Sequence, residues 1–588
     1  MRGLSRLSSI GLWLFVVIKL HAATFEIAQR HPQASDDGPG TTERPWKTIG
    51  KAAEHVAAGD TVIIHGGTYR ERIALKASGT AEKPIRFVSA PGEYVLLTGA
   101  DHLTGWKRAE TNRAIYRVEW PHRFIGWNKT MAHPGDERHR LVGRCEQVFI
   151  DGYLLRHVLS SDQLAPRTFF ADVTNKALLV WDIAGRDPNK TFTEASVRQE
   201  IFRVEGDHVQ LRGLRFRYAA NMAQHGAVVI AGDHAVVEDC VFESMNASGA
   251  TITGDHATVR RCVFRDNGEL GFGTTGSHSL LFTECLVENN NTKDFDRGWE
   301  AGGCKLCLSR DVVIERSRFV RNRGNGVWFD IGNENCTVRN CLIADNEDAG
   351  IFYEISYGLR AHDNVIVGNG FANTAGAWGA QAAISLSSSP ECVIERNLLV
   401  GNREGFNFRE QNRTTPRIGG DKREVAVWNH DQIIRHNIIA LNRDAQVWGW
   451  FDMKDNRHWP VGTGANQTAS TTGRREDIAA AYGAKTTEGQ LTGLTLEKLR
   501  ITFSNNVYFA GPGQGGFNWG PSWARNKKYS SLTDFQKELA IDNGGRVLDP
   551  EFADVMGLDF RLPRMRGAAL KDFYPRSAVP GVMLGERE

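Results

Sequence analysis

The chain has 588 residues, including 61 glycines, and its 71 lysine and arginine residues nearly balance its 69 aspartate and glutamate residues. This balance argues against a nucleic-acid-binding protein, which would carry a basic excess, and it leaves acidic polysaccharides as partners only through a local basic patch. A chain of this length would ordinarily divide into several domains, but a solenoid extends one continuous core with each added coil.

Residues 1–23 are expected to be a signal peptide. Arg2 and Arg6 precede an almost wholly apolar run from Ile10 to Ile18, and the small residues Ala22 and Ala23 offer a cleavage site. The run is short for a membrane span, and no cysteine follows it as a lipoprotein anchor would require. We therefore expect a secreted protein, periplasmic or extracellular, with no membrane span after signal cleavage; an uncleaved anchor is the alternative.

Residues 24–104 are expected to cap the solenoid and to form its first coils. A helix is predicted from Pro45 to Ala58, with Ile49 and Ala52 on its apolar face, and residues 61–69 alternate like a strand. A helix placed over the open end of a solenoid would protect its first coil from edge pairing.

Residues 105–205 break the pattern of the rest of the chain, and their apolar segments 147–152 and 177–181 predict a small β-rich insertion. From 206 to 515 one motif returns: an apolar residue, two variable residues, a cysteine or asparagine, and an apolar residue two further on. The recurring position is occupied by Cys240, Cys262, Cys285, Ser317, Cys341, Asn364, Asn397, Asn437 and Asn506, at successive spacings of 22, 23, 32, 24, 23, 33, 40 and 69 residues. The spacings of 22 to 24 match one coil of a β-helix, and the longer ones match coils that carry an insertion. We therefore predict an all-β protein folded as a right-handed parallel β-helix.

The recurring cysteine or asparagine is expected to face inward at a corner of each coil. Glycine and asparagine cluster between the strands, where tight corners require positive φ. Stacked asparagines would form an amide ladder that satisfies buried backbone groups, and the cysteines would act as small buried apolar side chains. Disulfides between neighbouring coils are an alternative.

A second insertion is expected at 443–500, and residues 516–588 are expected to form a C-terminal tail with the last coils. Nine cysteines are few for this length, so the chain is not a disulfide scaffold. Cys304 and Cys307 form a lone C-x-x-C without a second pair or nearby histidines, so no metal site is assigned to them.

Two consecutive coils carry an acidic residue in the same register. In the runs that begin at Gly326 and Gly350, the alternation places Asp330 and Glu354 on the outer face, 24 residues apart, which is one coil. Neighbouring parallel strands lie about 4.8 Å apart, so the two carboxyl groups would sit roughly 5 Å apart, as in retaining glycosidases. Two like charges at this distance raise one pKa, which would give a general acid beside an ionised nucleophile.

The alternative for this acidic pair is a solvated surface feature or a calcium site. No cofactor is expected, although the acidic pair leaves room for a structural or substrate-bridging Ca²⁺. Six further residues are candidates for substrate binding: Glu300, Lys305, Trp328, Phe352, Asn407 and Arg409. The two aromatic residues would supply stacking surface for a sugar ring, and the lysine would pair with the nucleophile or a hydroxyl group; ordinary ion pairs and packing are the alternatives.

His225 and the cluster of Trp448, Trp450 and Asp452 lie in or beside insertions that could wall a pocket. Packing is the favoured interpretation for these four residues.

These motifs resemble a known enzyme family. The run from Gly326 to Asp330, followed by Gly350 to Ser356 and preceded by Glu300-x-Gly302-Gly303-x-Lys305, is similar to the β-helix glycosidases of glycoside hydrolase family 120. The resemblance implies β-xylosidase-like activity, with the family's Asp nucleophile and Glu acid/base, carried on adjacent coils, mapping onto Asp330 and Glu354.

Two other functions stay open. A polysaccharide lyase or uronate epimerase would use Lys305 and Arg409 as candidate base and acid, often with Ca²⁺. A non-catalytic carbohydrate-binding solenoid would instead present the acidic pair on a flat exposed face. In each case the expected partner is an oligo- or polysaccharide, of plant or algal origin for the hydrolase.

Overall fold

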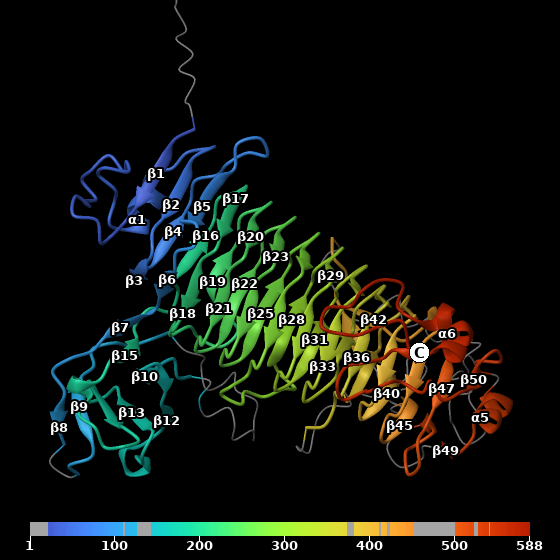
Figure 1. Ribbon diagram of the computed structural model, residues 1–588. Helices are drawn as coiled ribbons and strands as arrows, with labels where there is room; N and C mark the ends of the chain where they lie inside the picture. Colours follow the sequence, from blue (N-terminus) through green and yellow to red (C-terminus); the bar gives the residue numbers. More distant parts are fainter. Residues whose placement is uncertain are drawn as a thin grey trace, which may run out of the picture.

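The structure is a computed structural model that describes residues 22–109, 112–125, 141, 143–372, 381–410, 413–419, 424–451, 500–521, 527–539 and 541–587. The expected signal peptide therefore lies almost wholly outside the described residues. The strands stack into one elongated solenoid, from the blue N-terminal coils to the red C-terminal ones (Figure 1). Consecutive coils place their strands side by side and parallel in three long sheets, which confirms the predicted parallel β-helix.

Each of the three sheets holds one strand from each successive coil. Sheet 1 consists of β1 (Thr24–Ile27), β2 (Thr61–Ile64), β5 (Ile85–Ser89), β17 (Val209–Arg212), β20 (Val236–Glu238), β23 (Thr258–Arg260), β26 (Leu281–Thr283), β29 (Val313–Glu315), β32 (Thr337–Arg339), β35 (Arg360–His362), β38 (Val393–Glu395), β43 (Gln432–Arg435) and β46 (Ile501–Ser504). Sheet 2 consists of β3 (Gly67–Tyr69), β6 (Val95–Thr98), β18 (Arg215–Arg217), β21 (Val241–Glu243), β24 (Val263–Arg265), β27 (Leu286–Glu288), β30 (Arg318–Val320), β33 (Leu342–Ala344), β36 (Val365–Val367), β39 (Leu398–Val400), β44 (Ile438–Ala440), β47 (Val507–Phe509) and β50 (Arg546–Val547).

Sheet 3 carries the candidate site and ends in an antiparallel pair. It consists of β4 (Ile73–Leu75), β16 (Phe202–Val204), β19 (Gly226–Ile230), β22 (Ser248–Ile252), β25 (Leu270–Thr275), β28 (Gly302–Cys307), β31 (Asn325–Asp330), β34 (Ile351–Glu354), β37 (Ala382–Ser387), β40 (Glu404–Glu410), β45 (Ala445–Phe451), β48 (Phe517–Pro521) and β49 (Lys527–Tyr529).

The N-terminal cap is shorter than predicted. Helix α1 (Ile49–His55) begins after Thr48, whose hydroxyl accepts a hydrogen bond from the Lys51 N–H, and it buries Ile49 and Ala52 against the first coils. The predicted strand at 61–69 is two strands, β2 and β3, because the chain turns a corner of the coil between them.

The insertion consists of two small sheets beside the solenoid (Figure 1). Their strands are β7 (Ala100–His102), β8 (Lys107–Arg108), β9 (Tyr116–Glu119), β10 (Val148–Ile150), β11 (Tyr153–Leu154), β12 (Arg156–Val158), β13 (Thr168–Asp172), β14 (Ala177–Trp181) and β15 (Thr193–Ser196). The later insertion begins after the predicted position 443, because β45 is a strand of sheet 3 whose alternate residues Ala445 and Val447 are buried. Residues 452–499 lie outside the described residues.

The cysteines are free thiols rather than disulfides; eight are buried and Cys307 is partly buried. All nine are unpaired, so the alternative of disulfides between coils is wrong. At the recurring position the thiols point to backbone carbonyls, as Cys262 does to the carbonyl of Arg260 at 3.3 Å. Here the cysteine acts as the small buried side chain that the sequence predicts.

The amide ladder is also present. The Asn364 Nδ2 donates to Asn397 Oδ1 at 2.9 Å, and Asn397 donates to Asn437 in the same way at 3.0 Å. A second ladder, not predicted, follows the other side of sheet 2 through Asn267, Asn290, Asn322, Asn346, Asn369, Asn402 and Asn442. These bonds satisfy donors and acceptors that the core would otherwise leave unpaired.

Glycine and asparagine adopt positive φ at corners as expected, for example Gly213 with φ of 72° and Asn340 with 53°, but they are not the only residues that do so. Charged residues occupy many of the left-handed corners, among them Arg261 with φ of 51°, Glu284 with 57° and Arg316 with 45°. This left-handed conformation costs a non-glycine residue roughly 1–2 kcal/mol of conformational free energy.

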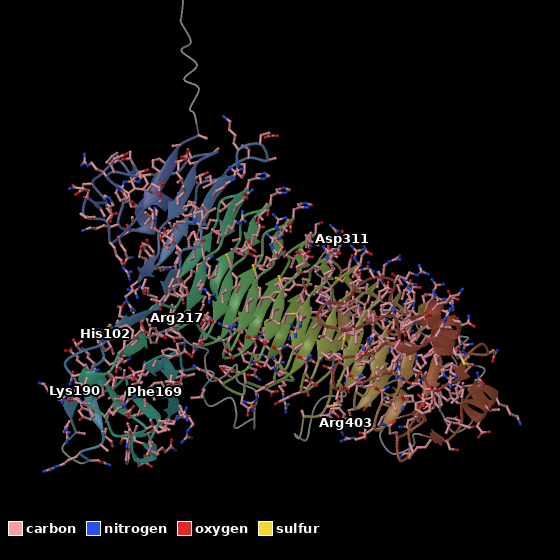
Figure 2. The ribbon with its side chains drawn as sticks, in the orientation of Figure 1. His102, Phe169, Lys190, Arg217, Asp311 and Arg403 are labelled. Carbon is pink, nitrogen blue, oxygen red and sulfur yellow. The ribbon has the colours of Figure 1, made fainter. Side chains whose placement is uncertain are left out.

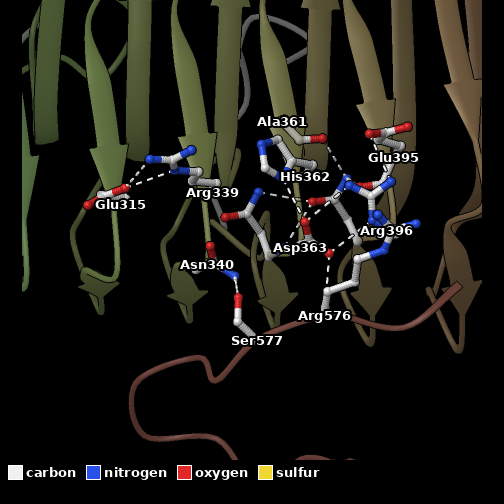
Figure 3. Close-up of polar contacts among 12 residues, drawn as sticks. Glu315, Arg339, Asn340, Ala361, His362, Asp363, Glu395, Arg396, Arg576 and Ser577 are labelled. Atoms are coloured by element: carbon white, nitrogen blue, oxygen red, sulfur yellow. Dashed lines mark hydrogen bonds and ion pairs between the residues drawn. The ribbon is translucent and has the colours of Figure 1, made fainter. Parts of the chain in front are cut away.

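The C-terminal tail, which includes α5 (Leu532–Leu539), β51 (Leu562–Pro563), α6 (Arg564–Leu570) and β52 (Glu586–Arg587), packs partly on the outside of sheet 2. There Val365 and Leu398 face outward and contact a cluster that includes Phe560 and Leu570. Polar contacts anchor the tail as well, since the Arg576 N–H donates to Asp363 at 3.0 Å (Figure 3). The outer face of these strands is therefore apolar, because the tail covers it.

Replacing Asn397 with alanine should destabilise the fold. The Asn397 amide donates to Ala361 O at 2.9 Å and to Asn437, and its Oδ1 accepts from the Asn364 N–H at 3.1 Å, all in the buried core. Leaving these partners unsatisfied should lower the free energy of unfolding by about 2–4 kcal/mol. Denaturant unfolding followed by circular dichroism measures the change. The exposed Asn175 changed to alanine is the control, and equal effects of the two variants would contradict the role of the ladder.

Candidate active site

The candidate residues come from neighbouring strands of sheet 3. Val327, Phe329, Ile351 and Tyr353 are fully buried inside the solenoid, so the strand alternation turns their neighbours outward. The register forms one outward row from Lys305, Trp328, Phe352, Ser385 and Asn407. A second outward row lies two residues further along the strands. In it Cys307 pairs with Asp330, and Glu354 pairs with Ser387, which pairs with Arg409. Phe329 pairs with Tyr353, so the next residues in the two strands, Asp330 and Glu354, lie opposite each other. Their backbones are separated by one strand spacing of about 4.8 Å.

This part of the outer face is shielded from solvent. Asp330 is 8% exposed and Glu354 3% exposed, so the acidic pair does not lie on a flat open surface. Trp328 and Phe352, expected to offer stacking surface, are 3% and 2% exposed and stack on each other with ring centroids 5.5 Å apart. Cations occupy their remaining faces: the Lys305 Nζ lies 4.0 Å from the Trp328 ring and the Arg409 guanidinium 5.5 Å from the Phe352 ring.

Lys305 is paired with Asp330. Its Nζ lies 3.0 Å from Asp330 Oδ2 and donates to the Trp299 carbonyl at 2.7 Å. Burial is the largest single effect and would lower the pKa of Lys305, but the charges of Asp330, Cys307 and Glu300 and the hydrogen bond to Asp330 together outweigh it, so the pKa lies above its ordinary value. Lys305 is therefore a cation at neutral pH.

Glu354 is held by two arginines. Its Oε1 lies 2.8 Å from Arg413 and 3.8 Å from Arg409. Burial raises the pKa of Glu354, the Asp330 charge raises it further, and the two arginines oppose both effects only in part. Burial lowers the pKa of Arg409 to about 10, so this guanidinium also stays charged at neutral pH. Sequence reasoning missed Arg413, which lies on the hairpin of β41 (Arg413–Thr415) and β42 (Val425–Val427) outside the repeat.

Two more carboxyl groups lie beside Lys305. Burial raises the pKa of Glu300 to about 7; the Lys305 charge opposes this and the Asp330 charge adds to it. Glu269, which the sequence analysis did not single out, is fully buried and accepts from the Gln224 N–H at 2.8 Å. Burial, and then the charge of Glu300, raise the pKa of Glu269 well above its usual range. The pKa values of Glu269, Glu300 and Glu354 are therefore all raised toward or above neutral pH, which favours their protonated forms.

Asn407 lies apart from the acidic pair. Its Nδ2 donates to Glu404 Oε2 at 2.7 Å, and burial raises the pKa of Glu404 to about 7 although that hydrogen bond opposes the rise. Trp448 follows Asn407 in the same row and is half-buried, whereas Asp452 lies outside the described residues and nothing is described of the Trp450 side chain. His225 lines a separate cavity.

No group of three or more histidine, cysteine, aspartate or glutamate side chains in the described ranges is placed to hold a metal ion. The described helices include none long and apolar enough to cross a membrane.

Known proteins share this architecture. A family model described as a right-handed β-helix region matches residues 201–399. A structure of XylC in complex with xylose is similar with a TM-score of 0.63 and 19% identity, over 90% of this chain and 87% of that one. A structure named as a glycoside hydrolase matches with a TM-score of 0.47 and 15% identity, over 66% of this chain and 94% of that one.

Two curated proteins match short segments. The uncharacterised protein YwoF of Bacillus subtilis is 46% identical over 68 residues, which are 12% of this chain and 14% of YwoF. Pectate lyase PEL9 of Emericella nidulans is 36% identical over 72 residues, which are 12% of this chain and 18% of that enzyme. The chain thus spans less than a fifth of the length of either relative.

Glu404 offers a test of the buried acids outside the acidic pair. Since its folded-state pKa of about 7 lies above the ordinary glutamate value of 4.5, the folded protein holds this proton more tightly than the unfolded chain. The protonated Glu404 therefore contributes to the free energy of unfolding below pH 4.5, and this contribution is lost as the pH rises to about 7. Glu404→Gln should therefore be more stable than the wild type at pH 8, by about 2–3 kcal/mol, with a smaller difference at pH 4.5.

Denaturant unfolding at both pH values measures this difference, with the exposed Glu82→Gln as control. A Glu404→Gln variant that is destabilised equally at both pH values would contradict a buried protonated carboxyl.

The strand order, the coil register and the match of the β-helix family model together give this chain the fold of a right-handed parallel β-helix.

Proposed function

We propose that the protein is a secreted retaining glycoside hydrolase that cleaves glycans of plant or algal origin, with a β-xylosidase-like preference. The observation that carries the proposal is the register that sets Asp330 and Glu354 at the ends of adjacent strands; the strand spacing of about 4.8 Å is close to the carboxyl separation of about 5 Å that retention requires. The resemblance of residues 300–356 to glycoside hydrolase family 120 supports the same assignment. The shared fold with XylC, whose structure holds xylose, agrees with it.

In the proposed reaction Asp330 attacks the anomeric carbon and forms a covalent glycosyl-enzyme. Lys305 engages Oδ2, so Oδ1 is the oxygen that attacks. Glu354, whose pKa is raised by burial and by Asp330, donates its proton to the departing oxygen. Glu354 then takes a proton from water, which releases the sugar with retained configuration.

The competing functions find less support in the same residues. A lyase or epimerase that uses Lys305 as its base needs a neutral amine, but the Asp330 carboxylate raises the pKa of Lys305. A binding solenoid would present open aromatic surface, but the rings of Trp328 and Phe352 are almost fully covered.

Substitution of the acidic pair separates the two roles. Glu354→Gln should lower kcat/KM on nitrophenyl xyloside by about 10²–10⁴ and much less on dinitrophenyl xyloside, whose leaving group needs no proton. Added azide should partly restore turnover and yield a glycosyl azide of retained configuration. Asp330→Asn should abolish cleavage of both substrates, without rescue by azide.

The exposed Asp311→Asn is the matched control and should behave as the wild type (Figure 2). Full activity of the Asp330 and Glu354 variants on every aryl glycoside that the wild type cleaves would exclude the assignment. An unsaturated uronate product, detected by its absorbance and lost in Lys305→Ala, would establish a lyase instead.

Arg413 should set the alkaline limit of activity. Its charge lowers the pKa of Glu354, so Arg413→Gln should raise that pKa and keep the general acid protonated to higher pH. The alkaline limb of the profile of kcat/KM against pH should move upward. Arg417→Gln, which removes a neighbouring arginine paired with Glu334, should leave the limb in place. A downward shift in Arg413→Gln would contradict Glu354 as the acid.

A further inference from the structure

A cavity lies where the insertion meets the solenoid. Its volume is about 440 Å³, and its walls come from Arg72, from residues 122–125 and 197–200, and from the loop 221–226 that leads into β19. In Figure 2 the insertion residues His102 and Phe169 lie to one side of the stack, and Arg217 marks the junction. The cavity is thus formed by two parts of the chain that are distant in sequence.

Positive charge dominates the lining of this cavity. Arg72, Arg123 and Arg198 line it, and Glu200 is the carboxylate among the lining residues. Arg72 lies 3.2 Å from Glu200, yet its side chain is 68% exposed and within reach of a ligand.

The nearby ion pairs do not cancel this charge. Arg203 binds Glu200 at 2.5 Å and Arg198 binds Asp101 at 2.8 Å. The lining itself holds three arginines, Arg72, Arg123 and Arg198, and one carboxylate, Glu200, which is a formal excess of two positive charges; outside the lining, Glu71 near Arg198 and Glu205 near Arg203 add negative charge. The whole chain has a net charge of only +2, so the excess is a local feature.

The two histidines of the cavity add polar groups without adding charge. Burial is the main cause that lowers the pKa of both His122 and His225. The charge of Asp101 opposes this effect at His122 and Arg198 adds to it, whereas at His225 Arg203 adds to it and Glu200 opposes it. Both imidazoles are neutral at neutral pH and can donate a hydrogen bond to a ligand.

One loop joins the cavity to the candidate active site. Residues 221–226 line the cavity on one side, and on the other the Gln224 N–H donates to Glu269, beside Glu300. The register from Gly226 through Ser248, Leu270 and Gly302 to Asn325 spans four strand spacings, or about 19 Å, and Asp330 lies at the other end of β31 from Asn325. A glycan lying along sheet 3 would reach both places.

We propose that this cavity is a subsite for a negatively charged sugar residue, carrying a carboxylate or a sulfate ester, a few residues along the glycan from the bond that is cleaved. The inference rests on the proposed glycosidase function and specifies its substrate class. Guanidinium forks match planar carboxylates and sulfate oxygens, and the balanced charge of the rest of the protein leaves selection of an acidic glycan to such a local site.

Binding to the Asp330→Asn protein, which should leave the glycan intact, tests the subsite. The probes are a xylo-oligosaccharide with a glucuronic acid branch, its carboxyl-reduced counterpart and a sulfated xylo-oligosaccharide, each titrated calorimetrically. An anionic probe should bind about tenfold or more tightly than the reduced one, and the stronger of the two anions identifies the group. Arg72→Gln with Arg123→Gln should remove the preference.

Arg212→Gln, which removes an exposed arginine of sheet 1 paired with Asp239 at 3.3 Å, is the matched control and should keep the preference. Equal binding of the anionic and reduced probes, no binding of either anion, or a preference that survives the double substitution would overturn the subsite. Cleavage of nitrophenyl xyloside by the unsubstituted protein, a substrate too short to reach the cavity, tests the hydrolase separately. Failure of the subsite is therefore distinguishable from failure of the enzyme.

Discussion

The register between neighbouring coils of sheet 3 is the constraint on which the candidate chemistry depends. A slip of one residue would turn Asp330 inward and bring a buried apolar side chain out in its place. The buried residues Phe329 and Tyr353 oppose such a slip. Hydrogen bonds at both ends of these strands oppose it too, including that from Asn322 to Asn346 at 2.9 Å and that from Asn333 to Ser356 at 3.1 Å. The register that sets Asp330 beside Glu354 is thus fixed by the core of the solenoid.

The length of one coil was sufficient to predict most of the fold and the acidic pair. Strand alternation and a 24-residue offset suffice to place Asp330 beside Glu354, because each coil repeats the geometry of the one before it. Arg413 escaped prediction because a hairpin insertion has no period to locate it, although it contacts Glu354 at 2.8 Å. Glu269 escaped because its burial depends on the loop 221–226, which folds over it from another coil.

The sequence does indicate that the outer face of sheet 2 is covered, although the alternation of apolar and polar residues does not show it. The strand Val365–Val367 is apolar at every position, which indicates burial on both faces rather than one. The C-terminal tail provides the second cover, with Phe560 and Val579 in the outer cluster. The charged residues in left-handed corners had no such signal, because positive φ is expected of glycine and asparagine rather than of arginine or glutamate.

The electrostatic coupling within the acidic pair bears on how one carboxyl could serve both halves of the proposed reaction. The negative charge of Asp330 raises the pKa of Glu354, so the free enzyme favours the protonated acid. Once Asp330 forms an ester with the sugar, that charge is gone, whereas Arg413 and Arg409 remain beside Glu354. The pKa of Glu354 must then fall, and the same group becomes the base that activates water. Glu300 experiences the same loss of charge, so the formation of the intermediate favours ionisation of both acids at once.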